Sequence, residues 1–303
     1  MGKIIAIIII LLLLVLAGLS AYLASYAVHG ARYTLEETLD YERKRKGLRV
    51  SEAEGYSWEP FEVKSFDGYV LHGQIAMHPE PTDKFMILTH GYTLNRNGSL
   101  KYVPLFRDLG YNCVIYDDRG HGLNAPHVCT YSLKEGRDLM VVIRELNRRF
   151  GDEIYLGLHG ESLGSATQIR ALMYHPDVKF VVNDCGFAEI IPVMQGGLRG
   201  MHLPGFMVYL ASLASRVMYG YAFTKARPID ALPGNTIPIC FIHGAADDFI
   251  TPDHSERMKA ATAGYAELHL IPGAGHAMAL ETDPEKYVEI VNEFVKKMET
   301  MQR

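Results

Sequence analysis

The chain has 303 residues, and its 30 Lys and Arg against 35 Asp and Glu give a formal net charge of −5. This acidic balance argues against nucleic acid as the main partner, because nucleic-acid binding needs a basic surface. Apolar residues make up 48% and charged residues 21%, which excludes a disordered chain. The four cysteines form no C-x-x-C pair, so the sequence shows neither a zinc ribbon nor a disulfide framework.

Residues 4–28 form an uncharged segment in which 22 of 25 residues are apolar. A helix of this length spans about 37 Å, which exceeds the roughly 30 Å of a bilayer's hydrocarbon core. A cleaved signal peptide is the alternative, since Ser25, Tyr26 and Ala27 form a small-x-small cleavage pattern. The apolar region of a signal peptide usually covers only about 7–15 residues, so we predict an uncleaved transmembrane anchor at 4–28.

Residues 29–60 are predicted to link this anchor to the body through a short helix. Thr34 and Glu37 have the spacing of a capping box at a helix N-terminus, and Gly47 marks the end of that helix. The charged run at 42–46 has two interpretations. It is either a solvated helix end, which the helix dipole favours, or a contact with anionic lipid headgroups.

The body, predicted as one domain over 61–303, alternates short apolar runs with amphipathic helices. Asp67-Gly68 is a hairpin signal between its first two strands. The later alternation is typical of βαβ units, so we predict an α/β fold with a mostly parallel sheet and helices on both faces. The expected strands are 61–65, 69–76, 84–89, 111–116, 154–158, 180–183, 237–242 and 267–271, and the expected helices are 133–150, 166–174, 254–261 and 284–298.

Residues 187–232 interrupt this alternation and are predicted to form a helical lid over the strand ends. The lid is rich in Gly and Met, and two interpretations of its apolar side chains stay open: they pack the lid onto the body, or they form an adaptable acyl pocket. The side chains concerned are Met201, Leu203, Phe206, Met207, Leu210, Leu213, Val217 and Met218.

The sequence Gly160-Glu-Ser-Leu-Gly164 lies between a predicted strand and a predicted helix. This G-x-S-x-G pattern, in that context, places Ser162 on a sharp turn with its hydroxyl at a helix N-terminus. A serine needs a base and an acid to become a nucleophile. His276 follows the last strand in a Gly-rich loop, and the adjacent Asp247 and Asp248 follow the strand before it.

Residues 61–298 resemble the α/β-hydrolase superfamily, and within it the Bem46-like and monoglyceride-lipase-like (serine aminopeptidase-like) hydrolases. The residues that carry the resemblance are His90-Gly91-Tyr92, Asp118-Arg119-Gly120-His121-Gly122, Gly160-Glu-Ser-Leu-Gly164, His243-Gly-x-x-Asp247 and Gly275-His276. The resemblance implies the α/β-hydrolase fold and a triad of Ser162, Asp247 and His276. It also assigns the oxyanion hole to the backbone N–H groups of Tyr92 and Leu163.

The same resemblance places Arg119 and His121 in a turn beneath the site, where a structural role is expected. Cys113, Cys185 and Cys240 are interpreted as small buried hydrophobes. We expect no cofactor and no metal, because the chain has neither H-E-x-x-H nor a G-x-G-x-x-G after a strand.

The predicted function is hydrolysis of a carboxylic ester through an acyl-enzyme, with a small acyl substrate. The alternatives are a small-peptide or amide hydrolase, an acyltransferase, and a non-catalytic membrane-anchored binding protein. The expected partners are the substrate and the lipid bilayer, without nucleic acid. The expected location is the cell membrane, single-pass with the domain outside, because Lys3 precedes the apolar run as in a signal anchor. Basic residues on the other flank, including Arg32, favour the opposite orientation.

Overall fold

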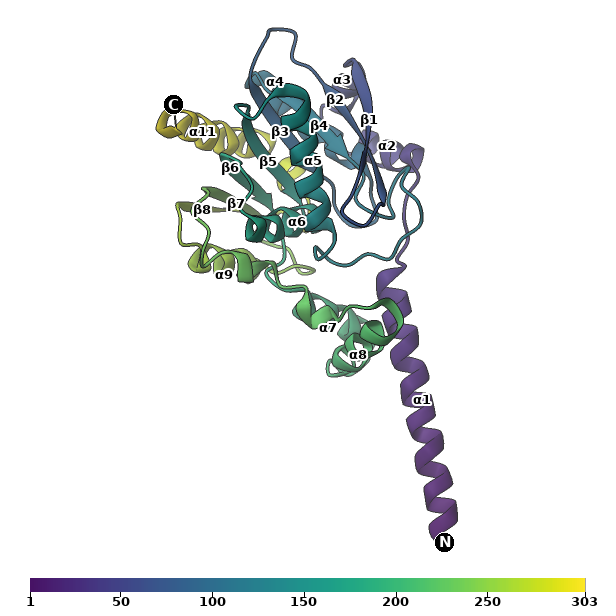
Figure 1. Ribbon diagram of the computed structural model, residues 1–303. Helices are drawn as coiled ribbons and strands as arrows, with labels where there is room; N and C mark the ends of the chain where they lie inside the picture. The colour runs from purple at the N-terminus through teal and green to yellow at the C-terminus, as the bar shows by residue number, and fades with distance from the viewer. Residues whose placement is uncertain (303) are drawn as a thin grey trace.

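Eight strands form a single sheet through the middle of the body (Figure 1). The computed structural model describes residues 1–302. Two antiparallel pairings join the first three strands in the sheet, and all the following pairings are parallel, as predicted. The spatial order is β1 (Trp58–Lys64), β2 (Val70–Ala76), β4 (Asn112–Tyr116), β3 (Lys84–Thr89), β5 (Tyr155–Glu161), β6 (Phe180–Asp184), β7 (Ile239–Gly244) and β8 (Ala266–Ile271).

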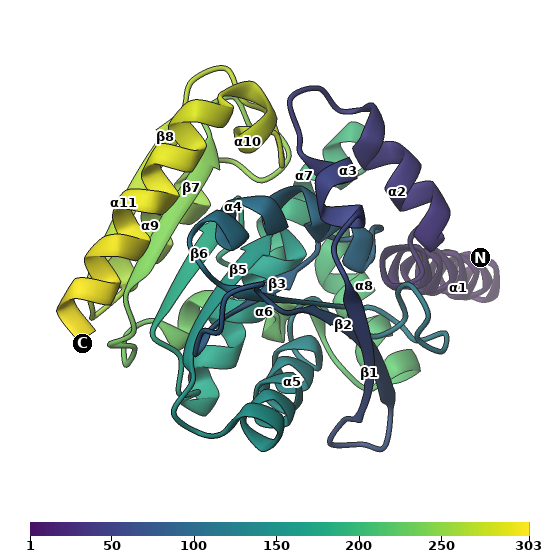
Figure 2. The same ribbon diagram turned by 90° about the horizontal axis from the view of Figure 1, so that it is seen from above.

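Helices cover both faces of this sheet, so its central strands are buried along their whole length. On one face, Phe106 and Phe294 pack into a core formed with α4 and α11. On the other, Leu139 and Ile169 belong to a second core beneath α5 and α6 (Figure 2). These helices are α4 (Val103–Asp108), α5 (Glu135–Phe150), α6 (Leu163–Ala171), α9 (Asp253–Ala261), α10 (Ala279–Thr282) and α11 (Pro284–Gln302), with the 3₁₀ turns η1 (Arg96–Tyr102) and η2 (Leu172–Tyr174).

The N-terminal segment is a 27-residue helix, α1 (Gly2–Val28), that projects away from the body (Figure 1). It is long and apolar enough to cross a membrane. Residues 1–18 are exposed, whereas Ser20, Leu23, Ala24 and Val28 are buried against the rest of the chain. The last third of α1 is therefore part of the folded body.

Two short helices, α2 (Leu35–Lys44) and α3 (Val50–Glu54), follow α1. The predicted capping box is present: Thr34 accepts a hydrogen bond from the Glu37 N–H, and the Glu37 carboxylate accepts one from the Thr34 N–H. The interpretation of 42–46 as a solvated helix end is wrong for two of its residues. Glu42 is fully buried and the Arg45 side chain is only 9% exposed, because both join a network of charges inside the body.

A helical insertion between β6 and β7 occupies the region predicted as a lid. It contains α7 (Ile190–Gly200), α8 (Met207–Tyr219) and the 3₁₀ turns η3 (Phe223–Lys225) and η4 (Pro228–Ala231). Figure 1 shows α7 and α8 beside α1, against which α8 packs. Side chains from α1, α7 and α8 form a third apolar cluster, separate from the two cores of the sheet.

Candidate active site

Ser162 lies at the sharp turn between β5 and α6. Its φ of 54° and ψ of −112° are rare for a residue with a side chain, and such strain is typical of functional sites. The turn closes only because its flanks are glycines. A Cβ on Gly160 would come within 2.6 Å of Gly164, and a Cβ on Gly164 within 2.2 Å of the Thr89 carbonyl oxygen. The G-x-S-x-G sequence thus holds the Ser162 hydroxyl at the N-terminus of α6.

His276 and Asp247 meet Ser162 from two other loops at the carboxyl edge of the sheet. Ser162 Oγ lies 2.9 Å from His276 Nε2, and His276 Nδ1 lies 2.7 Å from Asp247 Oδ2. Asp247 follows β7 and His276 follows β8. The three side chains therefore come from separate parts of the sequence and meet only in the folded chain. The three residues singled out in the sequence form one continuous line of polar contacts.

Asp247 is held in place on both carboxylate oxygens. Its Oδ1 accepts hydrogen bonds from the Phe249 and Ile250 N–H groups at 3.0 and 2.9 Å, and its Oδ2 faces His276 and, at 3.3 Å, His243. Burial opposes ionisation, but the hydrogen bonds from the two histidines outweigh it and hold the pKa of Asp247 well below its usual range. The neighbouring Asp248 is exposed, and among the described residues it forms no hydrogen bond or ion pair with His276. Asp247 therefore stays a carboxylate near neutral pH.

Tyr92 and Leu163, the residues whose backbone N–H groups are expected to form the oxyanion hole, both lie near Ser162. Leu163 is the first residue of α6, and Tyr92 belongs to the loop after β3, where a Cβ on Gly91 would lie 3.6 Å from Ser162 Cβ. Within residues 1–302, neither N–H donates a hydrogen bond to a protein acceptor. Both residues line the same cavity as Ser162, and the two N–H groups are thus available to a ligand there.

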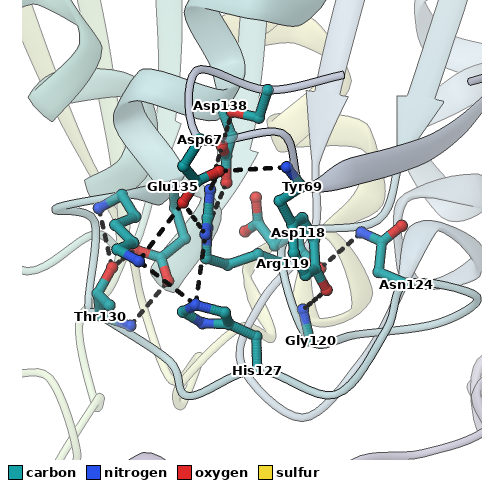
Figure 3. A network of polar contacts seen from close by, with 12 residues as sticks. Asp67, Tyr69, Asp118, Arg119, Gly120, Asn124, His127, Thr130, Glu135 and Asp138 are labelled. Carbon is teal, nitrogen blue, oxygen red and sulfur yellow. Dashed lines mark hydrogen bonds and ion pairs between the residues drawn. The ribbon is translucent and has the colours of Figure 1, made fainter. Parts of the chain in front are cut away.

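Arg119 has a structural role, as expected for its turn. Its guanidinium is fully buried and donates two hydrogen bonds of 2.7 Å to Asp138 and one of 3.0 Å to Asp67 (Figure 3). Partial burial raises the pKa of Asp67, but the hydrogen bond and charge of Arg119, together with the Tyr69 N–H and the charge of Lys134, outweigh burial and lower the pKa to about 2. His121 is also buried, with its ring against those of His90 and Tyr92. Neither residue touches Ser162 or His276.

An apolar cavity of about 390 Å³ opens beside Ser162. Residues from the insertion form one side of it, including Met194, Leu198 and Val208. The opposite side comes from α1 and the residues after it, for which the sequence predicts only an anchor and a linker. These residues are Leu23, Tyr26, Ala27, Gly30 and Ala31. No local sequence pattern marks them, because their role depends on contacts with loops 60 to 100 residues away.

A second, smaller cavity of about 210 Å³ lies on the other side of Ser162 and includes His276. Polar groups line it, namely the side chains of Tyr33, Tyr41 and Arg45. Arg45 also donates a hydrogen bond of 2.8 Å to the carbonyl oxygen of Ala277, next to His276. Ser162 therefore lines both an apolar cavity and a smaller one in which polar and apolar groups are mixed.

A buried network of charges supports the turn that carries Ser162. Glu161 lies 2.7 Å from the Lys101 ammonium, which lies 2.9 Å from Glu42, and Glu42 also pairs with Arg45. Burial raises the pKa of Glu161, but the charges of Lys101 and Arg45 lower it further and keep the carboxylate ionised. The network ties α2 to the residue before Ser162, a connection that no sequence motif indicated.

Two groups of potential metal ligands occur among the described residues. One consists of Cys185, Asp247 and His276, and the other of Cys240, Glu267 and His269. Burial holds the thiol pKa of both cysteines well above its usual range, so each remains a protonated thiol, a poor metal ligand. In the first group, Asp247 and His276 already bind each other. Cys113, Cys185 and Cys240 are all buried, as predicted.

The chain belongs to the α/β-hydrolase family, whose model, described as "Alpha/beta hydrolase family", matches residues 86–290. It is 31% identical to the uncharacterized protein YqkD of Bacillus subtilis strain 168 over 243 residues, which are 78% of this chain and 79% of that protein. Among solved structures, it resembles the Pyrococcus furiosus esterase Pf2001 with a TM-score of 0.67 and 22% identity, covering 83% of this chain and 94% of the esterase. It also resembles the Pyrococcus horikoshii acylaminoacyl peptidase, with a TM-score of 0.59 and 15% identity over 80% of this chain and 41% of the peptidase.

Proposed function

We propose that this protein is a serine hydrolase that cleaves a carboxylic ester through an acyl-enzyme. The observation that carries the proposal is the line of contacts from Ser162 Oγ to His276 Nε2 and from His276 Nδ1 to Asp247 Oδ2, at 2.9 and 2.7 Å. Such a line matches the geometry by which a nucleophilic serine is activated. The strained turn at Ser162 and the open N–H groups beside it support the same conclusion.

Each group then has a defined part in the reaction. His276 accepts the Ser162 proton on Nε2 as Oγ attacks the ester carbonyl, and ionised Asp247 stabilises the resulting imidazolium. The N–H groups of Tyr92 and Leu163 donate to the oxyanion, where one such donor is typically worth about 3–4 kcal/mol. His276 passes its proton to the leaving alcohol, and a water molecule releases the acid from Ser162 by the reverse sequence.

The two cavities support an ester with an apolar acid and a polar alcohol. The larger one is lined by aliphatic and aromatic side chains, which suit an acyl chain. The smaller one holds Arg45 and two tyrosines next to His276, which suits the alcohol portion. The likeness to Bem46-like and monoglyceride-lipase-like hydrolases agrees with this assignment and is part of the proposal.

Hydrolysis of an amide or small peptide is the second candidate, because the same groups would perform it. The similarity in fold to the Pyrococcus horikoshii acylaminoacyl peptidase favours this second candidate. An acyltransferase would use the same first step and a different acceptor. A screen of matched esters and amides of the same acids distinguishes them: the proposal predicts faster turnover of the esters, and a preference for amides would overturn it.

Covalent labelling tests the nucleophile. A fluorophosphonate probe should label the wild-type protein and fail to label the Ser162→Ala variant, whereas Ser165→Ala, which changes a buried neighbouring serine, should still be labelled. Labelling of Ser162→Ala at another serine would contradict the assignment. Absence of labelling in the folded wild type would instead favour a non-catalytic binding protein.

We also infer that α1 anchors the protein in the cell membrane as a single span, with the body outside. Its 27 residues and apolar composition support a span. Removal as a signal peptide after Ala27 would delete a buried part of the body, since Leu23 and Ala24 pack in its third apolar cluster. Protease added to intact cells should degrade the body, and protection until lysis would contradict the outward orientation.

A further inference from the structure

The C-terminal end of α1 is fastened to the loops around Ser162. Ala27, in its last turn, has a carbonyl oxygen that accepts hydrogen bonds from the hydroxyls of Tyr92 at 2.8 Å and Tyr131 at 2.5 Å. The Gly30 N–H donates to the same Tyr92 hydroxyl at 3.1 Å, and the Val28 carbonyl accepts from the Cys129 N–H. Carbonyls at a helix end need partners from elsewhere in the chain, and here the active-site loops supply them. The helix is therefore docked on the site as well as joined to it.

The same helix end forms a wall of the apolar cavity. Leu23, Tyr26 and Ala27 line it together with Ser162, and α7 and α8 line the other side. An acyl chain bound in this cavity would thus contact both α1 and the insertion. In a bilayer that α1 crosses, lipids would lie directly beside this wall of the cavity.

The length of α1 determines where the bilayer meets the body. Its exposed part, residues 2–18, spans about 25 Å at 1.5 Å per residue. The hydrocarbon core of a bilayer is about 30 Å thick, so it must extend beyond Gly18 onto the part of α1 against which α8 packs. Tilting of the helix would bring α8 deeper still. The insertion therefore lies at the level of the membrane surface.

The face of α8 that points away from the body is apolar, although it has no partner within the described chain. Its inner residues, such as Met207 and Ala211, are buried, yet Leu213 is 61% and Val217 is 80% exposed. Four exposed residues recur every three or four positions and form one stripe beside α1: Phe206, Tyr209, Leu213 and Val217. An exposed apolar stripe of this kind marks a binding surface for a protein or a membrane.

The charge of the insertion favours a membrane over water. Between Glu189 and Asp230 there is no acidic residue, although the whole chain has a net charge of −5. Three basic residues of this segment, Arg199, Arg216 and Lys225, are exposed. Basic residues around an apolar helix face attract the anionic headgroups of a bilayer surface.

We propose that the stripe on α8 lies in the surface of the bilayer that α1 crosses, and that the substrate is an acyl ester lipid of that bilayer. Its acyl chain enters the cavity between α1 and the insertion, so that the ester carbonyl reaches Ser162 without leaving the membrane surface. The C–O bond of the ester breaks, His276 protonates the leaving alcohol, and water releases a fatty acid. This inference rests on the proposed hydrolysis at Ser162.

Depth measurements test the position of α8 independently of activity. In the full chain reconstituted in vesicles, Val217→Trp should be quenched by lipids brominated near the headgroup end of their acyl chains, well beyond the background from the native Trp58. Phe150→Trp is the matched control. Phe150 is also exposed, but it lies before the N-terminal end of β5, whereas Ser162 follows the C-terminal end of the same strand. Equal quenching of the two variants would overturn the proposal, as would shielding of the Val217→Trp side chain by a second copy of the chain.

Activity measurements test the route of the substrate. In vesicles containing anionic lipid, the double variant Leu213→Glu, Val217→Glu should hydrolyse a bilayer-borne diacylglycerol at least about tenfold more slowly, because charged side chains are disfavoured in the membrane. Its turnover of water-soluble p-nitrophenyl butyrate should stay within about twofold of wild type, as should that of Phe150→Glu on both substrates. Unchanged diacylglycerol turnover in the double variant would refute the inference. If the wild type did not hydrolyse p-nitrophenyl butyrate at all, the proposed function would be refuted instead. The depth measurement would still decide the position of α8.

Discussion

Replacing Asp247 by Asn should remove most of the activity while leaving the fold intact. Asp247 Oδ1 is held by the Phe249 and Ile250 N–H groups, which an amide nitrogen cannot accept from. The amide oxygen of Asn must therefore occupy that position, and its NH₂ group must face His276 Nδ1. His276 would then carry its proton on Nε2, the atom that has to accept the Ser162 proton. Selecting the wrong tautomer costs about 10⁴ in turnover in other triads, which is about 5.4 kcal/mol of transition-state stabilisation.

The assay is kcat/KM for p-nitrophenyl butyrate, with unfolding followed by circular dichroism to confirm the fold. Asp248→Asn is the matched control, because it makes the same chemical change on the exposed neighbour and should alter turnover by no more than about twofold. An Asp247→Asn variant with activity within tenfold of wild type would refute the reasoning, and so would a larger loss in Asp248→Asn.

Two further predictions concern the cavity and the buried acid next to Glu161. Gly197 lines the apolar cavity, and a Cβ there would meet nothing within 4 Å, so Gly197→Leu should lower kcat/KM for decanoyl esters and spare acetyl esters. The wild type should prefer medium-chain esters to acetyl esters, and a flat profile in both proteins would exclude the cavity as the acyl site. Burial and the Glu161 carboxylate raise the pKa of Asp184 to about 6, above the roughly 3.9 of an unfolded Asp. The folded state thus binds this proton more tightly, and stability should fall by about 3 kcal/mol as pH rises from about 4 to about 6, then stay level. Urea unfolding between these pH values should show this fall in the free energy of unfolding in the wild type and not in Asp184→Asn. The same pH dependence in both proteins would contradict the prediction.

The sheet and the residues around Ser162 could be predicted from sequence because local patterns specify them. Short apolar runs bounded by polar turns predicted all eight strands within a few residues of their observed bounds. The glycines around Ser162 fix its backbone whatever surrounds them, and residues that follow parallel strands meet at one edge of the sheet. The G-x-S-x-G motif and the strand order therefore predicted that Ser162, His276 and an acid at 247 or 248 meet at this edge, whereas the choice of Asp247 came from the family resemblance.

The role of residues 19–54 could not be predicted, because it depends on contacts distant in sequence. An apolar run predicts a membrane anchor whether or not its end packs against the body. Here the Ala27 carbonyl oxygen at that end accepts hydrogen bonds from the Tyr92 and Tyr131 hydroxyls. Glu42 and Arg45 lie in a run of charges typical of a solvated helix end. Their burial follows from Lys101 and Glu161, which supply opposite charges in the interior. The pattern of residues 42–46 does not indicate these partners, so their burial could not be predicted from it.

The apolar residues of the insertion show the same limit within one element. The apolar side chains of the lid have different surroundings: Met201 lines the cavity and Met207 packs against the body, whereas Leu213, Val217 and Met218 are exposed. The two faces of α8 are both apolar, so composition alone cannot tell which one faces inward. Only the position of α1 beside it distinguishes them.

Trapping the acyl-enzyme tests the central claim most directly. The full chain is mixed with p-nitrophenyl butyrate, quenched in acid within the first turnovers, digested and analysed by mass spectrometry. The proposed mechanism predicts a butyryl group on the peptide that contains Ser162, at the Ser162 side chain, and none in the Ser162→Ala variant. Turnover of the ester with no acyl group on Ser162, or with the group on another residue, would contradict it.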